Sequence, residues 1–119
     1  MSGHINKYFK RLIKPKNNAI DILDIFGVSN PHLRQAFVNI VLGCNDMNIS
    51  QIDYFYINHN KYTEGMFIDV YDVLASFNIT DPGLQHGVKK ILNVGTRGVK
   101  DVETDLYEII SAISRRTLF

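Results

Sequence analysis

The chain has 119 residues, of which 45% are hydrophobic and 21% are charged, with a formal net charge of +1. This length suits one domain with one core, and no apolar run approaches the roughly 18 to 20 residues that span a bilayer, which excludes an integral membrane protein. A single cysteine, Cys44, excludes an internal disulfide and a cysteine-rich zinc site. The chain also starts without the apolar stretch of a secretory signal, so we expect an intracellular protein.

A basic amphipathic helix is predicted over residues 1–16, where apolar residues recur at helical spacing between Ile5 and Ile13. The basic residues of this arm are Lys7, Lys10, Arg11, Lys14 and Lys16, with no acid among them. The rest of the chain therefore carries all 12 acidic residues but only eight of the 13 lysines and arginines. Two interpretations remain: the arm docks its apolar side on the body of the protein, which we expect, or it engages an anionic partner.

One helical pattern then occurs twice, 51 residues apart. The matching positions include Asp21-Ile22-Leu23, Phe26, Asn30-Pro31 and Leu33 in the first copy, and Asp72-Val73-Leu74, Phe77, Asp81-Pro82 and Leu84 in the second. A match at a fixed period predicts two copies of one supersecondary unit that share a core. We assign the first unit to residues 17–58 and the second to residues 66–116, with a polar linker between them.

Each unit is predicted to open with a helix, over residues 17–26 and 68–77. A second helix follows in each unit, with Pro31 or Pro82 in its first turn. The capping residue before that proline is Ser29 or Asn30 in the first unit and Thr80 or Asp81 in the second. Left-handed caps at the ends of these helices are predicted at Gly43 and Gly95.

A third helix is predicted in each unit, one starting at Asp101 and one over residues 50–58 with Ser50 as its cap. For residues 50–58 a helix is favoured over a strand, although the segment is rich in tyrosine and phenylalanine. The fold class is therefore all-α: a compact bundle of about six or seven helices built from two tandem pseudo-symmetric units in a single domain over residues 1–119.

A basic cluster distinguishes the second unit from the first. His86, Lys89 and Lys90 share one side of a helix, and Arg97 and Lys100 precede the start of the last helix, whereas the first copy has Gln35, Val38 and Asn39 in place of the first three. Several cations beside a helix start favour a phosphate or carboxylate ligand. The alternative is a solvated surface on which Arg97 and Lys100 pair with acids of the last helix.

Tyrosines concentrate in the middle of the chain, at Tyr54, Tyr56 and Tyr62. They are candidates for an interaction surface, because tyrosine anchors protein partners and stacks on bases. The alternative is ordinary packing, which we expect for the neighbouring Phe55.

No catalytic machinery is recognisable. Asp21 with Asp24, and Asp69 with Asp72, place two carboxylates on one side of a helix, but the simpler interpretation is acids favoured by the start of a helix. The four histidines are scattered without the spacing of metal ligands. We therefore predict no enzyme activity, no cofactor and no metal.

Residues 68–115 resemble a family of small uncharacterised proteins encoded by tailed bacteriophages. The stretches that carry the resemblance are DVYDVL (69–74), FNITDPGLQHGVKK (77–90) and RGVKD (97–101). The resemblance implies a viral source and the host cytoplasm, and it implies no residue roles.

The leading hypothesis is a non-enzymatic phage-encoded protein that binds a host or phage protein in the infected cell, as an inhibitor or modulator. The alternative is a protein that binds nucleic acid or a phosphorylated small molecule through the basic cluster. The sequence leaves the identity of the partner and the oligomeric state open.

Overall fold

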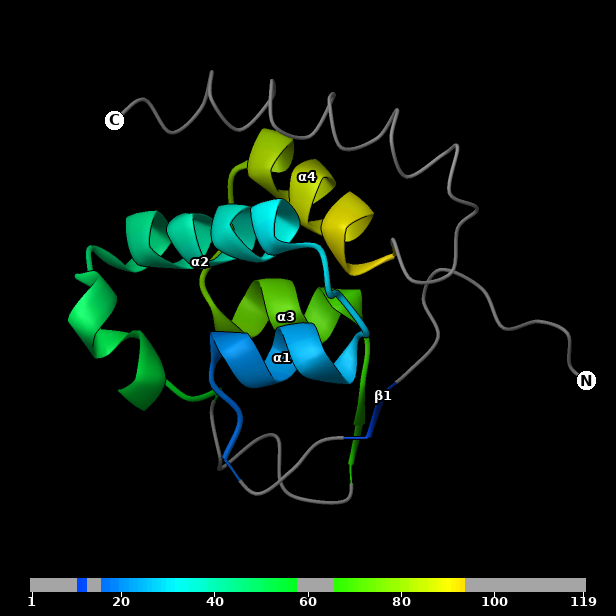
Figure 1. The fold of residues 1–119 in the computed structure, drawn as a ribbon. Helices are drawn as coiled ribbons and strands as arrows, with labels where there is room; N and C mark the ends of the chain where they lie inside the picture. The colour runs from blue at the N-terminus through cyan, green and yellow to red at the C-terminus, as the bar shows by residue number, and fades with distance from the viewer. Residues whose placement is uncertain (1–10, 13–15, 58–65, 94–119) are drawn as a thin grey trace, which may run out of the picture.

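The computed structural model describes residues 11–12, 16–57 and 66–93, which form a compact and mostly helical globule. Its helices are α1 (Ala19–Ile25), α2 (Pro31–Asn45), the 3-10 helix η2 (Ile49–Tyr54), α3 (Val70–Ser76) and α4 (Pro82–Leu92). Figure 1 shows α1 and α3 in one layer and α2 and α4 in the other. Helix α1 packs on α2, α3 packs on α4, and α2 also contacts α4 and η2. None of the helices in these ranges is long and apolar enough to cross a membrane.

The predicted helix over residues 1–16 is wrong at its C-terminal end. Arg11 and Leu12 form a strand, β1 (Arg11–Leu12), which pairs antiparallel with β2 (Phe67–Ile68). This short ladder gives Arg11 and Leu12 backbone partners from a distant part of the chain. A helical periodicity depends only on neighbouring residues, so it could not predict this pairing. The rest of the arm, including Lys7, Lys10 and Lys14, lies outside the described residues, and no extended sheet occurs within them.

Helices α1 and α3 begin with the same reciprocal pair of hydrogen bonds. The side chain of Asn18 accepts from the N–H of Asp21 (2.9 Å), and the Asp21 carboxylate accepts from the N–H of Asn18 (3.1 Å). Asp69 and Asp72 repeat this arrangement at 3.0 and 2.9 Å. Each helix thus starts two residues later than predicted, and Asp21 and Asp72 are confirmed as acids of a first helical turn.

The ends of α1 and α3 also correspond. The N–H of Val28 donates to the carbonyl of Leu23, and the N–H of Ile79 donates to the carbonyl of Leu74, both at 2.9 Å. A left-handed residue lies in each turn, Gly27 with φ 75° and Asn78 with φ 59°. Glycine and asparagine are the residues that adopt this conformation most readily.

The predicted starts of α2 and α4 are confirmed, with Pro31 and Pro82 as first residues and Asn30 and Asp81 as N-caps. The Asn30 side chain accepts from the backbone N–H groups of His32 (2.8 Å) and Leu33 (3.1 Å). The Asp81 carboxylate accepts from the N–H of Leu84 at 2.9 Å. These bonds satisfy donors that the first turn of a helix otherwise leaves without partners.

Replacing Asp81 by alanine is therefore expected to lower the free energy of unfolding by about 0.5 to 2 kcal/mol, measured by urea denaturation. Asn30→Ala should have an effect of the same size. Ser29→Ala and Thr80→Ala are the matched controls, since both side chains are exposed and neither is the N-cap. Equal losses from Thr80→Ala and Asp81→Ala would contradict this assignment of the caps.

Three further predictions need correction. Gly43 lies inside α2, and the left-handed cap is Asp46 with φ 52°. The helix continues because the carbonyl of Leu42 accepts from the N–H groups of Asp46 and Met47, which closes the last turn beyond the glycine. The segment after α2 is helical as predicted, but it is a 3-10 helix capped at Asn48 rather than Ser50. The five helices of the described part are fewer than predicted; Gly95 and the helix from Asp101 lie outside it.

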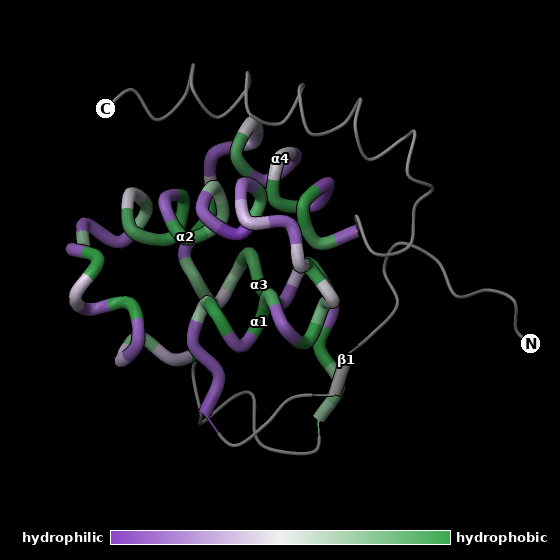
Figure 2. The backbone as a smooth tube through the Cα atoms, in the orientation of Figure 1, coloured by the Kyte–Doolittle hydropathy of each residue, from purple (hydrophilic) through white to green (hydrophobic). Residues whose placement is uncertain are grey.

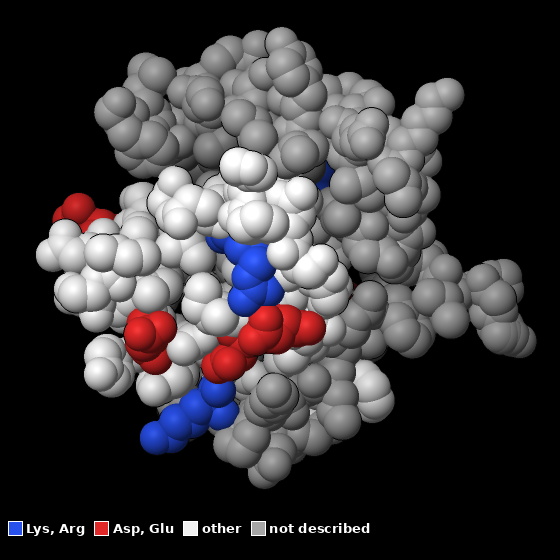
Figure 3. All heavy atoms as spheres, in the orientation of Figure 1, with Lys and Arg blue, Asp and Glu red and all other residues white. Residues whose placement is uncertain are grey.

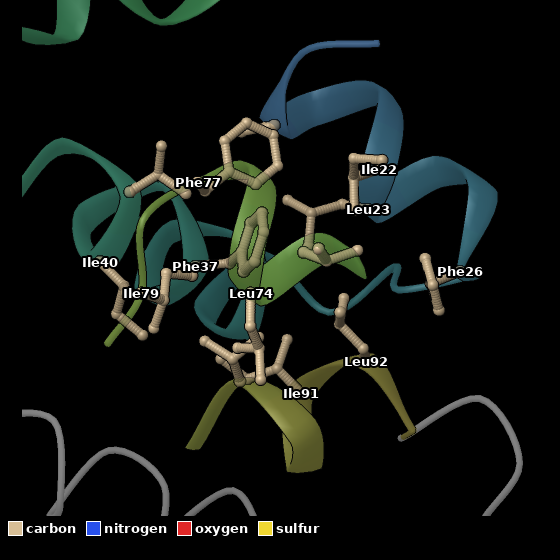
Figure 4. Packing of buried hydrophobic residues seen from close by; sticks show 14 of the residues in the cluster. Ile22, Leu23, Phe26, Phe37, Ile40, Leu74, Phe77, Ile79, Ile91 and Leu92 are labelled. Carbon is tan, nitrogen blue, oxygen red and sulfur yellow. The ribbon is translucent and has the colours of Figure 1, made fainter. Parts of the chain in front are cut away.

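The core gathers apolar side chains from all four α-helices, as Figure 4 shows. In Figure 2, hydrophobic and hydrophilic stretches alternate along these helices, as expected for helices with one buried side. Phe77 lies at the centre of an aromatic group: its ring meets Phe37 edge to face at 6.1 Å between centroids and Phe55 at 5.6 Å. Phe55 is half-buried and packs against the core, which agrees with the expectation for this residue.

Candidate functional site

A hollow of about 270 Å³ lies on the surface between α3 and the start of α4. Its lining consists of Tyr71, Leu74, Ala75 and Asn78 from α3 and the turn after it, Ile79 and Thr80 from the connection to α4, and Gln85 from α4. The spacing of the first four residues places them on one side of the helix and its continuation. The hollow therefore follows one side of α3, and Gln85 of α4 contributes to its lining.

The corresponding position between α1 and α2 is spanned by an ion pair. A terminal nitrogen of Arg34 lies 2.9 Å from the carboxylate of Asp24, and the other donates to the carbonyl of Val28 at 2.6 Å. At the 51-residue offset, Ala75 replaces Asp24 and Gln85 replaces Arg34.

Gln85 preserves only one of these two interactions. Its amide donates to the carbonyl of Ile79 at 2.9 Å, the counterpart of the bond from Arg34 to Val28. Ala75 offers no carboxylate, and the glutamine side chain is shorter than arginine. We attribute the hollow to these two shorter side chains, which do not fill the space between the helices.

A cation and an aromatic ring meet at the rim of the hollow. The ammonium group of Lys89 lies 4.9 Å from the centre of the Tyr71 ring, within the range of a cation–π interaction. Tyr71 is 49% exposed, so part of this residue remains accessible to a partner. Gln85 and Lys89 are four residues apart and thus lie on the same side of α4.

The Asn78 end of the hollow is fixed to α2 by hydrogen bonds. The Asn78 amide donates to the side-chain oxygen of Asn45 at 2.6 Å. The Asn45 amide in turn donates to the carbonyls of Val41 and Phe77, both at 2.8 Å. These bonds hold the left-handed turn at Asn78 in place, so the hollow has a preformed wall.

The structure unites part of the predicted basic cluster. His86 is exposed on α4, while Lys89 and Lys90 are half-buried on the same helix. Arg97 and Lys100 lie outside the described residues. Figure 3 shows one face of the molecule, where acidic and basic side chains of the described part lie beside one another.

The tyrosines predicted to form an interaction surface have different environments. Tyr54 is 77% exposed at the end of η2, which also exposes Ile49. Tyr56 is half-buried, and the ammonium group of Lys16 lies 5.7 Å from the centre of its ring. Tyr62 lies outside the described residues.

Groups with possible reactivity are few in the described ranges. Burial, followed by the charge of Asp81, raises the pKa of the Cys44 thiol, so this thiol stays protonated at neutral pH and is a poor nucleophile. Asp24 pairs with Arg34, and Asp21, Asp69 and Asp72 serve helix starts. No group of three His, Cys, Asp or Glu residues in the described part is arranged to hold a metal ion.

No protein-family model, curated protein or solved structure matches this chain. Of the residues at the hollow, sequence reasoning identified only Lys89, at its rim. The signal for the others was present in the repeat, since Asp24 and Arg34 are opposite charges in the first copy and Ala75 and Gln85 are neutral in the second. Their position across a groove became visible only with the packing of α3 on α4.

Proposed function

We propose that this protein is a non-enzymatic binding protein that engages a host or phage protein through the hollow between α3 and α4. The observation that carries the proposal is the composition of the hollow. Leu74, Ala75 and Ile79 give it an apolar wall, Tyr71 stands at its rim, and none of its lining residues is charged. An apolar recess with a tyrosine at its edge suits a side chain of a protein partner, because such sites contribute most of the binding energy at protein interfaces.

The anionic-ligand alternative is supported by one contact. Lys89 lies over the Tyr71 ring, so a cation and an aromatic surface are close enough to meet a phosphate and a base together. Binding of this kind weakens steeply as salt rises, whereas insertion of an apolar side chain does not. We rank it second because the recess itself lacks a basic residue.

We also propose that the fold derives from two tandem pseudo-symmetric helical units, and that the protein is phage-encoded and acts in the host cytoplasm. The recurrence of the caps and turn hydrogen bonds at a 51-residue offset supports the first statement. The resemblance of residues 68–115 to small tailed-phage proteins supports the second. In this scheme the second unit has lost the ion pair that the first unit retains.

The proposed function is tested by affinity capture from infected cells that express the tagged full chain. Wild-type protein should retain one stoichiometric partner protein, and Tyr71→Ala should lose it, because the ring at the rim of the hollow is removed. Tyr54→Ala is the matched control, since Tyr54 is more exposed but lies on η2, outside the hollow. A partner that is lost with Tyr54→Ala and retained with Tyr71→Ala would show that η2, and not the hollow, is the binding surface.

A further inference from the structure

We infer that the hollow receives an apolar side chain from an acidic protein segment, whose neighbouring carboxylate pairs with Lys89. This inference rests on the proposed function and specifies the chemistry of the partner. It follows from three features of the described residues: the size of the hollow, the charge at its rim and the position of the nearby acids.

The size of the hollow fits side chains better than a cofactor. Its volume of about 270 Å³ lies below the range of roughly 300 to 1,000 Å³ that is typical of small-molecule sites. Polar groups at its edge are limited to neutral side chains such as Thr80 and Gln85, and the Gln85 amide already donates to Ile79. One large aliphatic or aromatic side chain therefore fits this recess.

A basic side chain, Lys89, lies beside the hollow. Lys89 is held over the Tyr71 ring at 4.9 Å, and His86 and Lys90 are three residues before it and one residue after it on α4. In the first half of the chain the position of Lys89 is taken by Val38, which is buried. The open recess and the added cation thus occur together, in the same half of the molecule.

Two acids in the described part, Asp72 on α3 and Asp81 at the start of α4, are directed to helix starts. The Asp72 carboxylate accepts from the N–H of Asp69, and the Asp81 carboxylate accepts from the N–H of Leu84. A carboxylate from a partner complements Lys89 at this rim, whereas a basic partner would bring like charges together. An acidic segment with one apolar residue is the occupant that meets both the recess and the cation.

The test uses a library of random 12-residue peptides displayed against the immobilised full chain, with Tyr71→Ala for counter-selection. We expect the enriched peptides to place Asp or Glu next to a large apolar residue. One enriched peptide is then synthesised, together with a version whose acids are replaced by lysine, and binding is measured by fluorescence anisotropy. Lys89→Glu should weaken binding of the acidic peptide at least tenfold and strengthen binding of the lysine version. Lys16→Glu alters a second lysine that lies over a tyrosine in the described part, and it should change neither dissociation constant by more than about twofold.

Each outcome decides the inference. The inference is overturned if the enriched peptides have no acidic bias or if no peptide is enriched. It is also overturned if Lys16→Glu and Lys89→Glu weaken binding of the acidic peptide equally. The proposed function is decided separately by the cellular capture. A partner protein lost with Tyr71→Ala but retained by Lys89→Glu would leave the hollow as a protein-binding site and refute the acidic partner.

Discussion

Replacing Phe77 by alanine is expected to lower the free energy of unfolding by about 3 to 5 kcal/mol, the range seen for large buried aromatic residues. The Phe77 side chain is fully buried, and its ring contacts Phe37 and Phe55 edge to face. Removal of the ring loses its buried apolar area and both aromatic contacts, and it leaves a cavity among residues of three segments. Because small domains are stable by only about 5 to 15 kcal/mol, this loss should be plain in urea denaturation and in the melting temperature.

The matched control for Phe77→Ala is Phe67→Ala. Phe67 is 59% exposed on β2, so the same substitution should change stability by no more than about 0.5 kcal/mol. Phe77→Leu should give an intermediate loss, since it retains much of the apolar volume. Similar losses from Phe67→Ala and Phe77→Ala would contradict the central position of Phe77 in the core.

Closing the hollow with the ion pair of the first half should weaken partner binding by about 10- to 100-fold. In the double variant Ala75→Asp/Gln85→Arg, the new side chains have the same chemistry and sequence offset as Asp24 and Arg34, which lie 2.9 Å apart. The arginine would then occupy the space of the inserted side chain, whose burial contributes roughly 1.5 to 3 kcal/mol. The dissociation constant for the captured partner, measured by calorimetry, reports the loss.

The fold of this variant should be preserved, because Ala75 is exposed and a surface ion pair changes stability by only about 0 to 1 kcal/mol. The reciprocal variant Asp24→Ala/Arg34→Gln is the control: it makes the same exchange in the first half and should leave partner affinity unchanged. An unaltered dissociation constant in the closed variant, with an unaltered melting temperature, would show that the partner does not use the hollow.

The features that the sequence predicted well depend on residues close together in the chain. The caps at Asn30 and Asp81 bond to N–H groups two or three residues away, so the side chain, the proline and the helix start are visible as one short pattern. The sequence pattern predicted the end of α2 at Gly43, but the helix continues to Asn45 and its left-handed cap is Asp46. The contact of Asn45 with Phe77, 32 residues away, also lies beyond a local pattern.

The candidate site was predictable only in part for the same reason. Lys89 stood out as a charge present in one copy of the repeat, but its contact with Tyr71 joins two helices and depends on how α3 packs on α4. A hollow is a property of side-chain lengths at positions that meet only after packing. Superposition of the two units about a pseudo-twofold axis stays a prediction, as do the roles of the arm and of the residues beyond Asn93.

The pairing of β1 with β2 has a consequence for the order of folding. Arg11 pairs with Ile68, so the ladder closes a loop of more than 50 residues, at an entropic cost on the order of 3 to 4 kcal/mol for a flexible chain. Two paired residues on each strand do not offset that cost by themselves. We therefore expect the ladder to form after the helices between its strands have packed and shortened the loop, as a late step of folding rather than its nucleus.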